Sequence, residues 1–166
     1  MASQRTMTPG DQWVLLAYRL PRVPSTPRST VWRKLKRLGV AQLTDGLVAL
    51  PADARTREAL EWIAEDVVDN SGEAMLWLGH PAEQTGHDAI VAKMTATLAA
   101  DYTAVTAEAT ATRAADPATR RRVLARLRRE LHRIDNRDFF ALPERDTAHR
   151  AVEDLAALAE QEAMQA

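Results

Sequence analysis

Hydrophobic positions in the first half of the chain alternate between short continuous runs and helical stripes. Residues 13–18 are all apolar or aromatic and show no helical repeat, which predicts a strand buried on both faces. Residues 26–39 carry an apolar stripe and predict a helix. Thr26 is suited to the N-cap of this helix and Pro27 to its first position. Gly39 can adopt the left-handed backbone conformation that ends a helix.

The next forty residues predict a hairpin, a second helix and a further strand. Asp45-Gly46 is a tight-turn dipeptide between a short strand at 40–45 and an apolar run at 47–51. Apolar residues at helical spacing predict a helix over 54–70, and residues 73–78 read as a fourth strand. The four tryptophans on these elements are expected in the core.

This order of elements predicts an α+β fold of the ferredoxin-like βαββαβ type. The first and third strands are expected in the centre of the sheet because they are the most apolar. The helices would cover one face, and a second copy of the sheet or the C-terminal helices would cover the other.

The second half of the chain predicts about three helices and no strand. Apolar residues repeat at three and four from position 91 to about 113, and again over 117–138 and after Pro143. The predicted organisation is a flexible N-terminal lead (1–12), a ferredoxin-like domain (13–80) and a helical hairpin or bundle (87–166) that packs on its own sheet or on a partner.

Composition narrows the classes of function. The chain has 166 residues, a net charge of −1 and no cysteine. Bulk charge therefore does not favour nucleic-acid binding, and any such role must rest on local patches. Thiolate metal sites and a cysteine nucleophile are excluded. No apolar run reaches the length of a membrane span or a signal peptide, so a cytoplasmic protein without membrane contact is expected.

Two basic helices are the candidate nucleic-acid or anion-binding surfaces. The segment 21–39 contains no acidic residue. In the helix 117–138, arginines spaced four, three, four and four residues apart form one stripe, which suits a phosphate backbone or an acidic partner. The alternative is two solvated faces whose cations pair with nearby acids, such as those of the helix 58–69. The candidates are Arg28, Arg33, Lys34, Lys36 and Arg37, and Arg122, Arg126, Arg129, Arg133 and Arg137.

Catalytic and metal-binding motifs are absent from the sequence. No phosphate-binding loop, nucleophile elbow or zinc-protease motif occurs, and the four histidines lack ligand spacing. At the end of the first strand, where ferredoxin-like nucleases hold a metal with an aspartate, the chain has Tyr18, Arg19 and Leu20. We expect no enzyme activity, no cofactor and no metal.

Several segments resemble the N-terminal domain of ChrB, the chromate-resistance regulators. They are W-x-L-L-x-Y-x-x-P at 13–21, S-T-P-R at 25–28, V-W-R-K-L-K-R-L-G at 31–39, R-T-R-E at 55–58 and L-R-R-E-L…I…R-D-F-F at 127–140. The resemblance implies control of transcription in chromate resistance, with DNA as a partner. It places the cations of 28–37 in the family's first basic motif and Arg128, Arg129 and Arg133 in its second. Family members usually carry a further C-terminal domain, which leaves open whether chromate binds this chain.

A second hypothesis stays open beside the first. The chain would be a non-enzymatic, dimeric ferredoxin-like module that binds a protein partner or a small oxyanion such as chromate. The oxyanion would bind near the end of the first strand, on guanidinium groups and loop hydroxyls of Arg19, Arg22, Ser25, Thr26 and Arg28. A homodimer is expected under both hypotheses.

Overall fold

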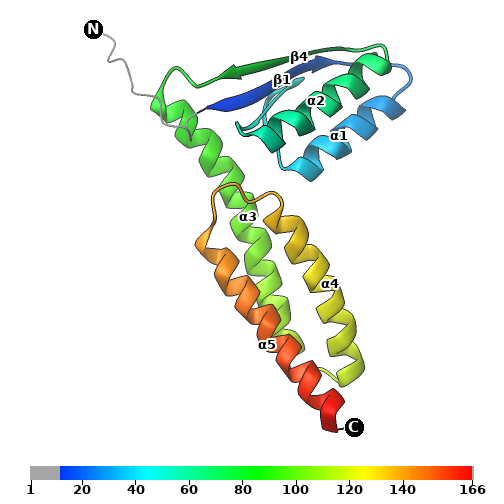
Figure 1. The fold of residues 1–166 in the computed structure, drawn as a ribbon, viewed down its shortest axis with the longest axis vertical. Helices are drawn as coiled ribbons and strands as arrows, with labels where there is room; N and C mark the ends of the chain where they lie inside the picture. Colours follow the sequence, from blue (N-terminus) through cyan, green and yellow to red (C-terminus); the bar gives the residue numbers. More distant parts are fainter. Residues whose placement is uncertain (1–11, 166) are drawn as a thin grey trace. The chain divides into compact units, whose positions relative to one another are not determined.

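The structure, a computed structural model, describes residues 12–165. The lead predicted for residues 1–12 therefore lies outside the described residues, apart from Gln12. The elements follow the order β1 (Trp13–Arg19), α1 (Thr26–Leu38), β2 (Ala41–Thr44), β3 (Leu47–Pro51), α2 (Ala54–Asp69), β4 (Glu73–Gly79), α3 (Gln84–Thr112), α4 (Pro117–Asp135) and α5 (Pro143–Gln165) (Figure 1). The α+β class is confirmed.

The chain divides into two compact units, and the division falls inside α3 between Met94 and Thr95. The first unit holds a four-stranded antiparallel sheet in the order β2-β3-β1-β4. The prediction that the first and third strands are central is confirmed, and their apolar composition explains it.

One face of the sheet forms the core of the first unit. Val14 pairs with Leu50 and Leu16 with Val48, so these four side chains share a face, and each is at most 1% exposed. The helices α1 and α2 lie side by side against the sheet (Figure 1). They add their own apolar stripes to this core, namely Val31, Leu35, Leu60, Ile63 and Val67.

Three of the four tryptophans differ from the expectation that they are buried. Only Trp13 lies in the core, Trp32 is half-buried, and Trp62 and Trp77 are 64% and 57% exposed. Trp62 comes one residue before the buried Ile63, so it is turned by about 100° from the apolar stripe of α2. Trp77 lies on the edge strand β4, where it pairs with Leu15. It therefore points to the sheet face opposite the one that carries Val14 and Leu16.

The helices α1 and α2 are capped in different ways. α2 begins with a capping box, in which Asp53 accepts from the Thr56 amide and Thr56 accepts from the Asp53 amide. The N-cap of α1 lies one residue earlier than the predicted Thr26. Ser25 occupies the N-cap position without a side-chain capping bond, and Gly39 ends the helix at φ 76° as predicted.

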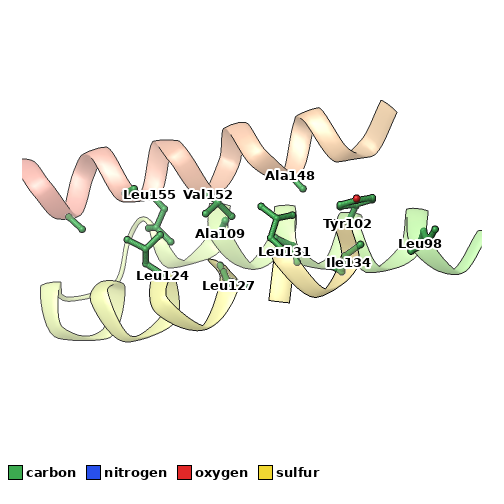
Figure 2. Close-up of a cluster of buried hydrophobic side chains, with 13 residues drawn as sticks. Leu98, Tyr102, Ala109, Leu124, Leu127, Leu131, Ile134, Ala148, Val152 and Leu155 are labelled. Carbon is green, nitrogen blue, oxygen red and sulfur yellow. The ribbon is translucent and has the colours of Figure 1, made fainter. Parts of the chain in front are cut away.

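The second unit is helical, with a core of its own. Leu124, Leu127, Leu131 and Ile134 of α4 are buried, as the stripe opposite the arginines predicts. They pack with residues of α3 and α5, including Tyr102, Val152 and Leu155 (Figure 2). Within residues 12–165, no helix is both long enough and apolar enough to cross a membrane.

Candidate anion-binding site

A cavity of about 1010 Å³ opens where β1 ends in the first unit. Its walls come from the end of β1, the loop that follows, the first turns of α1, the strand β2 and the turn between β2 and β3. Polar and aromatic side chains dominate the lining: Tyr18, Arg19, Arg22, Ser25, Arg28, Ser29, Trp32, Gln42 and Asp45.

The turn between β2 and β3 is held directly against β1. The Tyr18 amide donates to the Gly46 carbonyl at 2.8 Å, and Gly46 has φ +76°. A Cβ atom at Gly46 would lie 2.5 Å from the Tyr18 carbonyl oxygen, so no larger residue fits there without a shift. With the turn held against β1, Asp45 and Gln42 belong to the lining of the cavity.

The cavity is cationic, with three guanidinium groups and one carboxylate in its lining. Within the described chain, the side chains of Arg19, Arg22 and Arg28 form no hydrogen bond or ion pair, and all three are exposed. They are therefore available to an anion that enters from solvent.

Tyr18 contributes a neutral hydroxyl to this cavity. Burial raises the pKa of Tyr18 above its ordinary value; Arg28 opposes this shift and Asp45 adds to it. The phenol therefore stays protonated at neutral pH and can both donate and accept a hydrogen bond.

Sequence reasoning placed part of this site. Four of the five residues predicted to bind an oxyanion line the cavity, namely Arg19, Arg22, Ser25 and Arg28. The fifth, Thr26, is outside the lining. Sequence reasoning missed the lining residues Tyr18, Trp32, Gln42 and Asp45 as members of one site. Gln42 and Asp45 reach the site only because the β2–β3 hairpin pairs with β1, and no local sequence motif predicts that pairing.

Some of the basic side chains of α1 contact other protein groups, and others do not. Lys34 forms an ion pair with Asp66 of α2, which bears out the expected pairing of the two helices for this lysine. Arg33 bonds within its own helix, to the Ser29 carbonyl at 3.4 Å. Lys36 lies 6.0 Å from the centroid of the Trp32 ring. Arg37, like Arg28, has no hydrogen bond or ion pair in the part of the chain that is described.

The arginine stripe of α4 is divided in the same way. Arg126 forms an ion pair with Glu108 of α3, and Arg137 binds Asp101 of α3 at 3.0 Å. Arg133 lies 3.4 Å from Glu130. The remaining two, Arg122 and Arg129, are exposed and form no ion pair among residues 12–165. Part of the stripe therefore joins α4 to α3, and part is free to contact a partner.

Asp135 is the centre of a polar junction in the helical unit. It accepts from the Tyr102 hydroxyl at 2.9 Å and from Arg145 at 3.2 Å, and it lies 3.0 Å from His149 Nε2. Burial raises the pKa of Asp135, but the hydrogen bonds from Tyr102 and His149 and the charges of His149 and Arg145 outweigh it and lower the pKa. Both carboxylate oxygens of Asp135 already have partners within the protein, so this junction connects helices and offers no free ligand-binding group.

Metal ligands do not converge in the described part of the chain. Among residues 12–165, no group of three or more histidine, aspartate or glutamate side chains could hold a metal ion.

The fold and the cavity define an α+β protein with an accessible cluster of unpaired arginines. Residues 28–116 match the family described as Protein ChrB, N-terminal. The match covers more than half of the chain, and the chain belongs to this family. The matched range includes α1 from Arg28 onward, while β1, Arg22 and the arginine stripe of α4 lie outside it.

A curated relative is similar over a shorter stretch. Protein ChrB of Cupriavidus metallidurans is 35% identical over 71 residues, which are 43% of this chain and 21% of the relative. The matched region thus spans about a fifth of that relative's length. No solved structure matches the chain.

Proposed function

We propose that the chain is a regulatory module of the chromate-resistance type, which contacts DNA through basic helices in the control of transcription. Membership of the ChrB N-terminal family supports this proposal. The observation that carries it is the acid-free segment 21–39, in which the side chains of Arg28 and Arg37 form no hydrogen bond or ion pair among residues 12–165. Its phosphate contacts would position DNA, and base readout would come from elsewhere.

The architecture belongs to the same proposal. We infer a ferredoxin-like arrangement for the first unit, supported by the βαββαβ order and the antiparallel order β2-β3-β1-β4. The domains would be 13–80 and a helical region over 87–166. We further propose a cytoplasmic homodimer. Met75 and Trp77 support a dimer, because both are 57% exposed on the sheet face that a second copy would cover.

Only part of the arginine stripe of α4 is free to contact phosphate. A phosphate at Arg126 or Arg137 would have to displace a carboxylate of α3, whereas Arg122 and Arg129 are free of ion pairs within the described chain. DNA contact by α4 should therefore depend on Arg122 and Arg129 far more than on the paired arginines.

Fluorescence anisotropy with a duplex from the chain's own promoter, and with a random duplex, tests this proposal. Binding should weaken as salt rises, with a slope in log–log form of roughly −0.9 for each phosphate contact. Arg122→Gln/Arg129→Gln and Arg28→Gln/Arg37→Gln should each weaken binding and reduce this slope by about two contacts.

Arg126→Gln/Arg137→Gln is the matched control, since it removes the same charge from the same arginine stripe at ion-paired positions, although Arg137 lies just beyond the end of α4. If the control variant lost as much DNA affinity as Arg122→Gln/Arg129→Gln, the loss would reflect total charge and not contact by the unpaired arginines. Absence of binding to both duplexes at low salt would refute the DNA-contacting role.

The second candidate function is a module that binds a small oxyanion without DNA. The three unpaired guanidinium groups of the cavity favour it. Chromate, sulfate or phosphate should then raise the melting temperature in a saturable way, and Arg19→Gln/Arg22→Gln should abolish this rise. A melting temperature that does not respond to any of these anions would rule this candidate out.

A further inference from the structure

The cavity at the end of β1 is far larger than an inorganic oxyanion. An ion of five heavy atoms fills on the order of two or three water volumes, each of about 30 Å³. The cavity holds about 1010 Å³, which is the upper end of the roughly 300–1,000 Å³ of pockets for organic ligands. A small anion bound to the arginines would leave most of this space to water.

The lining also contains groups that an inorganic anion does not need. Two aromatic residues, Tyr18 and Trp32, belong to the lining, and Trp32 is half-buried on α1. Aromatic faces of this kind stack flat heteroaromatic rings. Gln42 and Asp45 add an amide and a carboxylate, whose side chains lie 3.5 Å apart. A carboxylate disfavours a simple anion, but it accepts hydrogen bonds from ring amino groups and sugar hydroxyls.

Charge and hydrogen-bonding capacity are divided between different elements. The three guanidinium groups come from β1, the following loop and α1, whereas Gln42 and Asp45 come from β2 and the turn after it. The cavity therefore offers guanidinium groups for a phosphate together with an amide and a carboxylate that can bond the edge of a ring.

We propose that this cavity binds a mononucleotide, an organic anion that joins a phosphate to a flat heteroaromatic base. Arg19, Arg22 and Arg28 hold the phosphate. Trp32 stacks on the base, while Gln42 and Asp45 bond its edge or the sugar. The proposal rests on the anion binding proposed above as the second candidate function, and it names the ligand class.

Thermal shift and intrinsic tryptophan fluorescence of the full chain test the proposal. The probes are the four nucleoside monophosphates, inorganic phosphate and the phosphate-free nucleosides. At least one monophosphate should saturate the chain at a concentration roughly tenfold to hundredfold below that of inorganic phosphate, the gain expected from one stacked base. The nucleosides should bind weakly, because they lack the charge that the arginines hold.

Three variants separate the parts of the site. Trp32→Leu and Gln42→Ala should weaken mononucleotide binding and leave phosphate binding unchanged, whereas Arg22→Gln/Arg28→Gln should weaken both. Trp62→Leu is the matched control, because Trp62 is an exposed tryptophan on α2 outside the lining, and it should bind like the wild type. Gln42 is exposed on β2, so its variant tests the site even where Trp32→Leu fails to fold.

The outcomes distinguish failure of this proposal from failure of anion binding itself. Equal affinity for phosphate and every monophosphate would overturn the nucleotide assignment and leave the small-oxyanion function standing. Unchanged mononucleotide affinity in Gln42→Ala and Trp32→Leu would overturn it as well. An absence of any response to phosphate and to nucleotides would overturn both.

Discussion

The Tyr102 hydroxyl donates a hydrogen bond of 2.9 Å to Asp135, which links α3 to α4. The Tyr102 side chain itself lies in the buried core of the helical unit (Figure 2). The same hydroxyl lies 3.2 Å from Asp138, whose carboxylate accepts from the Phe140 and Leu142 amides. Burial raises the pKa of Tyr102, and the two carboxylates raise it further, so the phenol remains a donor at every ordinary pH. One phenol thus connects α3, α4 and the segment that leads to α5.

Tyr102→Phe should lower the free energy of unfolding by about 1–3 kcal/mol, because Asp135 and Asp138 lose a donor while the ring stays packed. Urea unfolding followed by circular dichroism measures the change. Tyr18→Phe is the control, since the Tyr18 hydroxyl has no hydrogen bond among the described residues, and it should change stability by less than about 0.5 kcal/mol. Equal stability of Tyr102→Phe and the wild type would contradict the linking role.

Acid should weaken the helical unit through Asp135. Its pKa in the folded chain lies below the ordinary 3.8, so the unfolded chain takes up the proton first as pH falls. The stabilisation by Asp135 is therefore complete above the unfolded pKa and is lost as pH falls through the folded pKa. The difference in unfolding free energy between the wild type and Asp135→Asn should have its full value near pH 5 and shrink below about pH 4.

Urea titrations at a series of pH values measure this difference. Asp69→Asn, at an exposed position on α2, serves as the control and should run parallel to the wild type. A gap for Asp135→Asn that stays constant down to strongly acidic pH would show that the junction does not hold the carboxylate in its charged form.

Gly46→Ala should destabilise the first unit by more than about 1 kcal/mol, because the left-handed conformation disfavours a side chain and the new Cβ would meet the Tyr18 carbonyl. Thermal unfolding measures the loss. Gly79→Ala is the matched control on β4, where the nearest atom to the new Cβ is a Leu15 methyl at an ordinary 3.7 Å. Similar melting temperatures for the two variants would show that the turn can relax away from β1.

The ion pair between Lys34 and Asp66 should contribute less than about 1 kcal/mol to stability, although it links α1 to α2. Both side chains are more than a third exposed, so solvent screens their attraction. A double-mutant cycle with Lys34→Met and Asp66→Asn measures the coupling energy and its decline in high salt. A salt-independent coupling well above 1 kcal/mol would mean that the pair is shielded from solvent.

Local sequence was sufficient to predict most elements of the fold. The apolar run at 13–18, the helical stripes and the Asp45-Gly46 turn each depend on neighbours within a few residues, so periodicity and turn chemistry reveal them. The central position of β1 and β3 also followed from the sequence. A strand with neighbours on both edges is more fully buried than an edge strand, and its residues are correspondingly more apolar. The basic character of α1 and α4 is likewise a property of the sequence itself.

Only the tertiary structure decided which of these side chains are engaged. The sequence pointed to the acidic residues of 58–69 as partners for the first basic helix. Only the structure pairs Lys34 with Asp66 and Arg126 with Glu108, across 32 and 18 residues of sequence. Trp62 is exposed and Trp32 lines a cavity, although both occupy helices with similar apolar stripes. A helical period tells which residues share a face, whereas the packing of distant elements determines what covers that face.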